Sequence, residues 1–359
     1  MTLEHKSVAC DIIIPVWNQP ALTQRCLDSL AASTPGPHQV ILIDNGSEAP
    51  TRQLLEAYAA EHPGRVRVIR NPENLGFIKA ANQGLRASTN PFVCLLNNDT
   101  VVTDGWLDEM IHVADRDSRI GLVNPSSNTL GYTPPQATLE GVRRYATSLT
   151  AQRGQVRRMA MGVGFCLLIR RAVLDAIGLL DERYGMGNFE DADLSKRALA
   201  AGYRCVQALG AYVYHEEKAS FKHQTHWKRA FRENQQAFYA KWGRPLRILW
   251  DLPAHSMGQE WTALMLRLLD AGHWLTYPHP AEDLPTLVRD HAGVNCLQGQ
   301  APLWYVLKRR KKPVDLIVTA NPRLARWLAC LKRLHQATVL MTPSPTQLET
   351  LCQQRSRSL

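Results

Sequence analysis

Phe92-Val93-Cys94-Leu95-Leu96 is a short apolar run, and the polar block Asn97-Asn98-Asp99-Thr100 follows it directly. A continuous apolar run of this length indicates a strand that is buried on both of its faces. The polar block then lies at the carboxyl end of that strand, where open parallel sheets bind their ligands. This stretch therefore predicts a parallel sheet with a candidate site at one edge.

Upstream of this stretch, apolar runs alternate with helical patterns. Strands are predicted at Asp11–Ile14, Val40–Ile43 and Val66–Ile69. We expect Pro15 to end the first of these strands. The spacing of apolar residues predicts helices at Leu22–Ala32, Arg52–Glu61 and Phe77–Ala87. This β-α-β-α order predicts an α/β fold with a Rossmann-like, mostly parallel sheet that is flanked by helices.

The pattern loosens over Tyr132–Thr150, a stretch rich in Pro, Gly and Thr that predicts a mobile loop. Beyond it, the sequence predicts strands at Val163–Ile169 and Val206–Tyr214 and helices at Ala172–Ile177, Glu190–Ala201 and His226–Trp242. We place a domain boundary at Gly243-Arg244-Pro245, which divides the chain into residues 1–243 and 244–359.

The second part shows a new α/β pattern of its own. Strands are predicted at Arg247–Leu252, Trp274–Tyr277, Val314–Thr319 and Ala337–Met341. Helices are predicted at Trp261–Ala271 and Pro322–Leu334. The sequence therefore predicts a second, smaller α/β domain.

The composition restricts the class of protein. The chain has 359 residues, 45% of them hydrophobic, which is typical of a globular protein of two domains. The eight cysteines are scattered and form no Cys-x-x-Cys pair, as in proteins of a reducing compartment. Met1–Ala9 lacks the apolar core of a signal peptide, and no apolar stretch approaches the length of a membrane helix, about 18 residues. We therefore expect a cytoplasmic protein.

The positive charge is concentrated in the second part. Residues 244–359 carry 15 Lys and Arg against 8 Asp and Glu, whereas residues 1–243 carry 27 against 24. The densest basic run is Lys308–Lys312, which can attract an anionic membrane surface at the inner face of the membrane or a phosphate-bearing substrate. The alternative is a solvated loop. Because no aromatic residues interleave this run, we do not expect a nucleic-acid partner.

Each candidate catalytic group also has a structural interpretation. Asp99 can hold a divalent cation at the strand end, or it can cap the following helix. Three carboxylates begin the predicted helix at Glu190, where one can serve as general base and the others can stabilise the helix dipole. His215 follows an apolar run, so it can be a metal ligand or a structural residue.

The order of these blocks makes the interpretation more specific. The blocks, in chain order, are Pro15-Val16-Trp17-Asn18, Ile43-Asp44-Asn45-Gly46-Ser47, Asn74-Leu75-Gly76-Phe77, Ala80-Ala81-Asn82-Gln83-Gly84, Asn97-Asn98-Asp99, Gly164–Arg171, Leu180–Arg183, Glu190–Arg197 and His215. This series resembles family-2 glycosyltransferases with a GT-A fold, and it is most similar to their rhamnosyltransferase-like branch. The resemblance covers about residues 9–240, so it implies that residues 1–243 form a GT-A catalytic domain.

The resemblance implies a set of residues that bind the nucleotide sugar. Pro15 and Asn18 would lie beside the nucleotide, and Asp44 would hydrogen-bond the base or the ribose. The remaining members of this set would shape the nucleotide pocket or contact the sugar nucleotide: Asn74, Gly76, Asn82, Asn97 and Asn98. The donor implied is a UDP-, dTDP- or GDP-sugar.

The resemblance also implies the catalytic and metal-binding groups. Asp99 resembles the metal-binding aspartate of the family's Asp-x-Asp motif, and His215 would lie near the metal or the diphosphate. Asp191 resembles the catalytic base, with Glu190 beside it. Asn97 stands where the motif has its first aspartate, so Asp99 would be the only motif carboxylate on an Mg²⁺ or Mn²⁺ ion.

The activity implied is an inverting, metal-dependent transfer of a hexose or deoxyhexose to a polysaccharide or glycolipid acceptor. An alternative of another class is a catalytically inactive GT-A module that binds carbohydrate or acts as a scaffold. The second part, through Leu246–Gly258 and Ala271-Gly272-His273, resembles the N-terminal half of a GT-B glycosyltransferase. That resemblance implies either an accessory, acceptor-binding domain or a truncated GT-B half.

Overall fold

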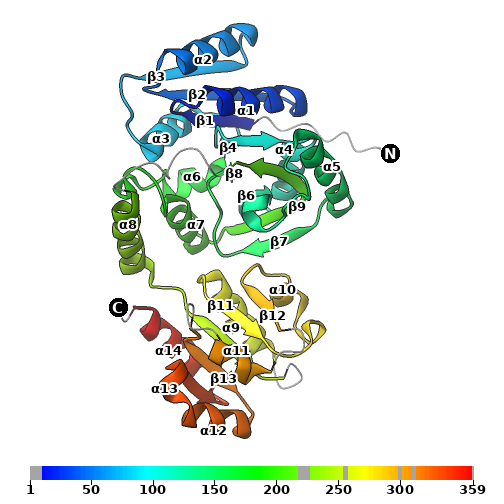
Figure 1. Ribbon diagram of the computed structural model, residues 1–359, viewed down its shortest axis with the longest axis vertical. Coiled ribbons are helices and arrows are strands. Elements are labelled where there is room, and N and C mark those ends of the chain that lie inside the picture. Colours follow the sequence, from blue (N-terminus) through cyan, green and yellow to red (C-terminus); the bar gives the residue numbers. More distant parts are fainter. Residues whose placement is uncertain (1–9, 217–226, 254–257, 298–300, 309–312, 358–359) are drawn as a thin grey trace. The chain divides into compact units, whose positions relative to one another are not determined.

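The computed structural model describes residues 10–216, 227–253, 258–297, 301–308 and 313–357. The chain forms two compact units, of which the first comprises residues 1–157 and 161–235 and the second residues 158–160 and 236–359 (Figure 1). The division falls within helix α8 (Trp227–Trp242), whereas the sequence places the domain boundary at Gly243. Each unit is described separately below.

The first unit is built on a nine-stranded sheet. Its strands are β1 (Cys10–Val16), β2 (His38–Asn45), β3 (Val66–Asn71), β4 (Phe92–Leu96), β5 (Thr100–Val102), β6 (Ile120–Ser126), β7 (Val156–Met159), β8 (Cys166–Arg170) and β9 (Arg204–His215). Their order is β3-β2-β1-β4-β8-β6-β9-β5, with β7 paired to β9. The strands β3, β2, β1 and β4 are mutually parallel, as are β6 and β9. The expected α/β fold with a mostly parallel sheet is confirmed.

Strand β1 continues through Pro15 to Val16, so the expectation that Pro15 ends this strand is wrong. Pro15 lies opposite Ile43 of β2, but the pairing of β1 with β4 ends at Ile13. Beyond Ile13 the ladder has a partner on one side only. A proline, which lacks the N–H, is tolerated where a strand is unpaired on one side.

Helices cover both faces of this sheet (Figure 1). They are α1 (Pro20–Ser33), α2 (Ala49–Glu61), α3 (Phe77–Ala87), α4 (Trp106–Asp115), α5 (Leu139–Leu149), α6 (Arg171–Ile177), α7 (Glu190–Ala200) and the first part of α8. One large core joins alternate residues of β1, such as Ile12 and Ile14, to Leu27 of α1 and Trp106 of α4. Ile13 points to the other face, where it contacts Gly84 of α3.

Helix α5 lies inside the stretch Tyr132–Thr150, for which the sequence predicts a mobile loop, so that prediction is wrong over Leu139–Leu149. The Thr138 hydroxyl accepts a hydrogen bond from the Gly141 N–H and caps the helix. Val142 packs with Tyr212 of β9 in a small separate cluster. An N-cap and a few buried side chains thus stabilise a helix in a stretch whose composition is typical of a loop.

The second unit contains a five-stranded sheet in which every pair is parallel. Its strands are β10 (Arg247–Asp251), β11 (Trp274–Tyr277), β12 (Val294–Cys296), β13 (Leu316–Thr319) and β14 (Thr338–Met341), in the order β12-β11-β10-β13-β14. Its helices are the end of α8 and α9 (Gln259–Asp270), α10 (Thr286–Arg289), α11 (Pro302–Lys308), α12 (Pro322–Cys330), α13 (Lys332–His335) and α14 (Pro345–Arg357).

In this unit, alternate residues of the central strand β10 face two different layers of helices. Ile248 and Trp250 of β10 pack with residues of α9, α10 and α14. Leu249, between them, packs with residues of α11 and α12. The sequence prediction of a second α/β domain is consistent with this three-layer arrangement, and its likeness to a GT-B half stays a prediction.

Two expectations about membranes meet different outcomes. Within the described residues, none of the helices combines the length and the apolar character that crossing a bilayer requires. The basic run Lys308–Lys312 lies outside the described residues except for Lys308, which ends α11.

Candidate functional site

The first half of the candidate site lies where β4 ends. Asp99 directly precedes β5, and the antiparallel pairing of β5 with β9 places Thr100 opposite His215. Oδ1 of Asp99 therefore lies 3.2 Å from Nε2 of His215. The backbone also joins the two ends, because the Glu216 N–H donates to the carbonyl oxygen of Asp99 over 2.9 Å. Two predicted site residues that are far apart in the sequence are thus neighbours.

Two residues contact the His215 ring, and a third holds its backbone. Phe165 stacks on it with ring centroids 5.1 Å apart and an angle of 17° between the planes. The Thr129 hydroxyl lies 3.0 Å from Nδ1. Asn128 accepts a hydrogen bond from the His215 N–H and donates one to its carbonyl oxygen. With a proton on Nδ1 shared with Thr129, the lone pair of Nε2 faces Asp99.

The Asp99–His215 pair fits a divalent cation. Oδ1 of Asp99 is buried and has no hydrogen-bond partner among the described residues, although Nε2 of His215 lies 3.2 Å away. In the described part of the chain, no set of three or more His, Cys, Asp and Glu side chains could hold a metal ion. Asp99 and His215 would therefore supply two ligands at most. A site with one carboxylate and several open positions is typical of Mg²⁺ bound together with substrate phosphates.

The second half of the site is the start of helix α7. Asn188 and Phe189 both have left-handed backbone conformations, with φ of 76° and 74°. Such conformations are costly for residues other than glycine and persist only where the surroundings enforce them. Helix α8 supplies that support, because the Asn234 side-chain amide donates to the carbonyl oxygens of Tyr184 and Gly187, and Phe231 packs against Phe189.

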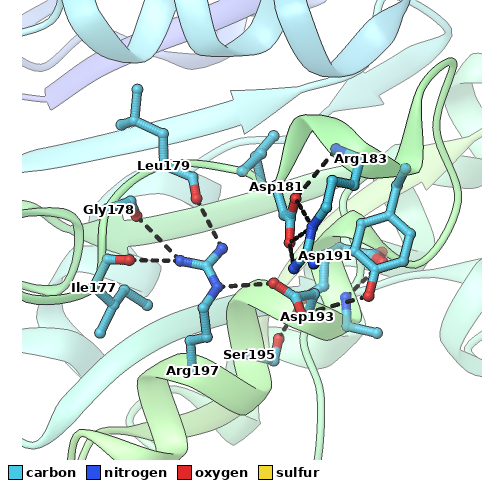
Figure 2. Close-up of polar contacts among 12 residues, drawn as sticks. Ile177, Gly178, Leu179, Asp181, Arg183, Asp191, Asp193, Ser195 and Arg197 are labelled. Atoms are coloured by element: carbon cyan, nitrogen blue, oxygen red, sulfur yellow. Dashed lines mark hydrogen bonds and ion pairs between the residues drawn. The ribbon is translucent and has the colours of Figure 1, made fainter. Parts of the chain in front are cut away.

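The carboxylates at the start of α7 have different partners. Asp193 is fully buried and pairs with Arg197, whose guanidinium also donates to the carbonyl oxygens of Ile177 and Leu179. Figure 2 shows this arrangement, with Arg197 between the Asp193 carboxylate and the Ile177–Leu179 turn. Asp193 therefore fastens α7 to that turn. The structural interpretation that the sequence leaves open applies to this carboxylate.

Asp191 has a different environment. Its Oδ2 accepts a hydrogen bond of 2.9 Å from the Gly164 N–H, and its Oδ1 accepts one from the Ala192 N–H. Its side chain is partly exposed. Phe165, the next residue after Gly164, stacks on His215. Two consecutive residues therefore contact the Asp191 carboxylate and the Asp99–His215 pair, so the two halves are neighbours.

Glu190 and Asp191 influence each other's protonation. Burial, and then the charge of Asp191, raises the pKa of Glu190 to about 8. Burial also raises the pKa of Asp191, whereas the N–H groups of Gly164 and Ala192 oppose that rise. Because hydrogen bonds stabilise the charged form of Asp191, it is the first of the pair to ionise. An ionised Asp191 beside a protonated Glu190 is suited to accept a proton.

The nucleotide side of the predicted site lies at the ends of β1 and β2. Asp44 is buried, with 1% of its surface exposed. Its oxygens accept hydrogen bonds of 2.9 Å from the Ser47 N–H and from Nε of Arg70. The Arg70 side chain is 38% exposed and also pairs with Glu56. At this edge, the buried Asp44 carboxylate holds the guanidinium of Arg70, which reaches the surface.

Pro15 and Asn18 lie at the end of β1, beside this edge. Pro15 is partly exposed on the strand. Asn18 has a left-handed backbone with φ of 56°, and its side-chain oxygen accepts a hydrogen bond from the Glu48 N–H. Its own N–H donates to the Ser47 hydroxyl. Asn18 thus connects the loops that follow β1 and β2.

The loop between β3 and α3 is shaped by amides. Asn45 donates to the side chain of Asn74 and to the carbonyl oxygen of Gly76. Gly76 has φ of 86°, and a Cβ atom there would lie 2.9 Å from Sδ of Met186. Met186 belongs to the turn before α7. Asn74 and Gly76 therefore form a wall that adjoins the loop carrying the Asp191 helix.

Three other predicted amides are tied to the protein. Asn82 is buried, and its side chain exchanges hydrogen bonds with the backbone of Leu180 while also donating to Glu182. Asn98 donates to the Thr23 hydroxyl of α1. The Asn97 N–H donates to the carbonyl oxygen of Phe165. These contacts give the residues a role in shaping the site.

Sequence reasoning missed several residues that position the site, all of which act over a long sequence separation. They are Arg70 beside Asp44, Thr129 and Asn128 around His215, Asn234 beneath the α7 loop, and Asn124, whose amide donates to the carbonyl oxygens of Val163 and Cys166. Phe165 and Gly164 belong to the block Gly164–Arg171, which contributes to the family resemblance. Their local pattern does not indicate a ring stack or a carboxylate partner.

Comparisons with known proteins identify the family and the fold that the chain resembles. Residues 11–178 match the family described as "Glycosyl transferase family 2". The chain is 27% identical over 227 residues to an N-acetylglucosaminyl-diphospho-decaprenol L-rhamnosyltransferase of Mycobacterium tuberculosis, a match that covers 55% of this chain and 72% of that protein. It is 29% identical over 226 residues to the O-antigen biosynthesis protein RfbC of Myxococcus xanthus, covering 58% of this chain.

The length of the relatives differs from that of this chain. The matched region spans 17% of the Myxococcus protein and 27% of a further relative in Sinorhizobium fredii.

Among solved structures, a mannosyltransferase of Pyrobaculum calidifontis in complex with GDP-Man and Mn²⁺ has a similar fold. The TM-score is 0.50 and the identity is 16%, over 96% of this chain and 84% of that chain. Residues 11–178 therefore match a glycosyltransferase family 2 domain, and the fold is similar to that of a solved glycosyltransferase.

Proposed function

We propose that the chain transfers a hexose or deoxyhexose from a nucleoside-diphosphate sugar to a saccharide acceptor, a polysaccharide or glycolipid, with inversion at the anomeric carbon. The family 2 domain and relatives named as a rhamnosyltransferase and as an O-antigen biosynthesis protein support this class of reaction. The observation that carries the proposal is the geometry around Gly164 and Phe165. Gly164 holds the Asp191 carboxylate, and Phe165 packs on the His215 ring beside Asp99.

In the proposed reaction, Asp191 removes the proton from the acceptor hydroxyl. The acceptor oxygen forms a bond to the anomeric carbon while the bond from that carbon to the diphosphate oxygen breaks. The nucleoside diphosphate leaves with the bonding electrons, so a single displacement inverts the configuration. The raised pKa of Asp191 makes it a stronger base than an exposed aspartate.

Asp99 and His215 would hold an Mg²⁺ or Mn²⁺ ion. When bound, the ion supplies positive charge for the diphosphate oxygens and lowers the cost of their departure. Asp99 contributes the carboxylate, and His215 contributes Nε2 when its proton is on Nδ1, which lies 3.0 Å from the Thr129 hydroxyl. The missing first aspartate of the motif, replaced by Asn97, leaves this site with one fewer negative charge.

The donor nucleotide would occupy the edge formed by Pro15, Asn18 and Asp44, with the Asn74–Gly76 loop as a wall. Arg70 adds a cation to this edge that sequence reasoning did not include. We also propose that the basic second unit associates with the surface of a membrane, where glycolipid acceptors reside.

A panel of UDP-, dTDP- and GDP-sugars tests the proposed function. We expect release of a single nucleoside diphosphate with Mg²⁺ or Mn²⁺ and none after EDTA, with an excess of metal restoring the release. Adding an extract that contains the polysaccharide or glycolipid acceptor should raise the release rate. The product should have the anomeric configuration opposite to that of the donor.

Two outcomes would contradict the proposal. Binding of a nucleoside diphosphate without turnover of any donor would favour the inactive carbohydrate-binding module. Turnover that persists in EDTA would remove the cation from the proposal. The exposed substitution Asp175→Asn on α6 serves as the control in every comparison of variants, because it changes the charge away from the site.

A further inference from the structure

One helical layer of the second unit has an unusual surface. Helices α11 and α12 cover the same face of the sheet, since Val306, Leu324 and Leu328 share one core cluster with Ile317 of β13. Helix α13 follows α12, and its His335 side chain lies 2.8 Å from the carbonyl oxygen of Leu328. Helix α13 also contacts α11. We call the outward side of α11, α12 and α13 the basic aromatic face.

The charge of this layer is almost entirely positive. Residues 302–335 contain nine Lys and Arg and a single acidic residue, Asp315. Asp315 is occupied elsewhere, because its oxygens accept hydrogen bonds from the Arg244 side chain and from the Arg247 N–H. The described basic residues of the face are all exposed, and none forms an ion pair with another described residue: Lys308, Arg323, Arg326, Lys332 and Arg333.

Large apolar side chains project from the same helices. Trp304 of α11 is 62% exposed, Trp327 of α12 is 59% exposed and Leu334 of α13 is 66% exposed. On α12, Arg323, Arg326 and Trp327 lie on the side opposite the buried Leu324 and Leu328. An outward stripe that combines arginines with tryptophan is unfavourable in water but suits the boundary between lipid headgroups and acyl chains.

The other helical layer provides an internal comparison. Helices α9 and α14 carry acidic and basic residues together, and Arg267 pairs with Glu349 across them. Both layers therefore belong to the same positively charged unit, but only the layer with α11, α12 and α13 lacks compensating carboxylates. A net charge spread for solubility would not distinguish the two layers.

We propose that the basic aromatic face docks on an anionic lipid bilayer, with Trp304, Trp327 and Leu334 entering the interface and the Lys and Arg residues facing the headgroups. The inference specifies the membrane association within the proposed function and rests on it for its biological purpose. Two signals act together here, since basic residues and apolar side chains each bind a membrane weakly alone. An anionic lipid bilayer is the chosen partner because of charge complementarity, since the face is positive and the bilayer surface is negative.

Sedimentation with lipid vesicles tests the inference on the full chain. Vesicles of equimolar phosphatidylcholine and phosphatidylglycerol should bind the protein at low salt, and vesicles of phosphatidylcholine alone should not. The variant Arg323→Glu/Arg326→Glu should lower the partition coefficient by at least about 25-fold, because each basic residue near an anionic surface contributes about fivefold and each new glutamate adds repulsion. Trp327→Ser should lower it by roughly three- to tenfold, and this loss should persist at high salt.

Matched variants on the other layer separate the face from net charge. Arg289→Glu/Arg357→Glu changes the charge of the chain equally on α10 and α14, and Leu287→Ser removes a side chain that is 65% exposed on α10. Both should leave vesicle binding within about twofold of the original. Equal losses in the two sets would overturn the inference. So would binding to a single-stranded oligonucleotide through Arg323 and Trp327 with no binding to vesicles.

A measurement of nucleoside diphosphate release without vesicles tests the proposed activity separately from membrane docking. The variants of the face should release it at the original rate, whereas Asp191→Asn should fail to release it and still bind vesicles. If the face variants bind vesicles normally, the docking surface is wrong and the activity stands. If Asp191→Asn turns over normally, the assignment of Asp191 as the base is wrong and the docking surface stands. If the original protein turns over no donor, the proposed activity is wrong and the docking surface stands. Thermal unfolding confirms that each variant is folded.

Discussion

The two sides of the candidate site differ in how their polar atoms are used. On the side of Asp99, His215 and Asp191, polar atoms remain available, since Oδ1 of Asp99 has no hydrogen-bond partner among the described residues and Asp191 is partly exposed. On the nucleotide side, Asp44 and Asn82 are buried and bonded to the protein. We propose that this difference separates groups that act on a substrate from groups that maintain the shape of its pocket.

The comparison has a physical basis. A buried polar group with every hydrogen bond made stabilises the fold but has little capacity left for a ligand. A buried carboxylate oxygen without a partner lowers the stability of the fold and is best compensated by a cation or a proton. Substitutions on the two sides should therefore change different observables, namely turnover on one side and the free energy of unfolding on the other.

Asp191→Asn should have the largest effect. Removing the general base should lower kcat by about 10²- to 10⁴-fold, with the Kd for the nucleoside diphosphate almost unchanged. Steady-state turnover and calorimetric titration measure the two quantities. Near-normal turnover would break the assignment of this side as the catalytic one, provided that Asp175→Asn behaves as the original protein.

Asp99→Asn should come next. The substitution keeps the shape of the side chain but removes the carboxylate that would hold the cation, so we expect activation by Mn²⁺ to require roughly 100-fold more metal. A titration of turnover against Mn²⁺ concentration gives this value. Thr129→Val should weaken activation less, by about tenfold, because Thr129 only orients the His215 ring. An unchanged metal requirement in both variants would contradict the placement of the cation.

Asn82→Ala tests the nucleotide side. Loss of the Asn82 side chain leaves the N–H and carbonyl groups of Leu180 without partners, so the free energy of unfolding should fall by about 1–3 kcal/mol. The KM for the donor should change less than threefold, or roughly 0.6 kcal/mol. Urea unfolding and donor titrations measure these effects. A large rise in KM with unchanged stability would show that Asn82 contacts the donor directly.

Glu190→Gln should have the smallest effect on turnover at neutral pH, since burial already raises the pKa of Glu190 to about 8 and keeps it protonated. A raised pKa stabilises the fold fully below the ordinary value of 4.5, and this contribution is lost as the pH rises through 8. As the pH rises from 4.5 to 8, the free energy of unfolding of the variant should therefore fall less than that of the original protein. Thermal unfolding across this pH range measures the difference, and parallel curves would refute it.

Much of the fold follows from local sequence. The helix at Phe77–Ala87 and the strands at Phe92–Leu96 and Trp274–Tyr277 have the predicted bounds, because apolar periodicity and turn residues determine both ends. Helix α5 was not predicted, because its stability depends on the cap at Thr138 and on contact with Tyr212 far along the chain. Pro15 was misjudged for a similar reason, since only the sheet topology shows on which side β1 is unpaired.

The candidate site follows from the sequence in part. The family resemblance identifies Asp99, Asp191 and His215, and the structure brings Asp99 together with His215 through the pairing of β5 with β9. Local pattern could not separate Asp191 from Asp193, because both lie in the first turn of α7. Their difference comes from Gly164 and Arg197, which contact them from distant or following positions. The ion pair of Arg70 with Asp44 could not be predicted from local sequence either, because it depends on the pairing of β2 with β3.

Helix α8 has a practical consequence for dissecting the chain. Its Asn234 and Phe231 support the loop before Asp191, and the division between the two compact units falls directly after them, between Gln235 and Gln236. A truncation placed at that division would cut one continuous helix and leave the supporting turns frayed at a new carboxyl terminus. Fragments that end after Trp242 should keep the loop ordered, whereas fragments that end before Trp227 should lose catalytic competence even though the sheet and its strand-end residues are intact.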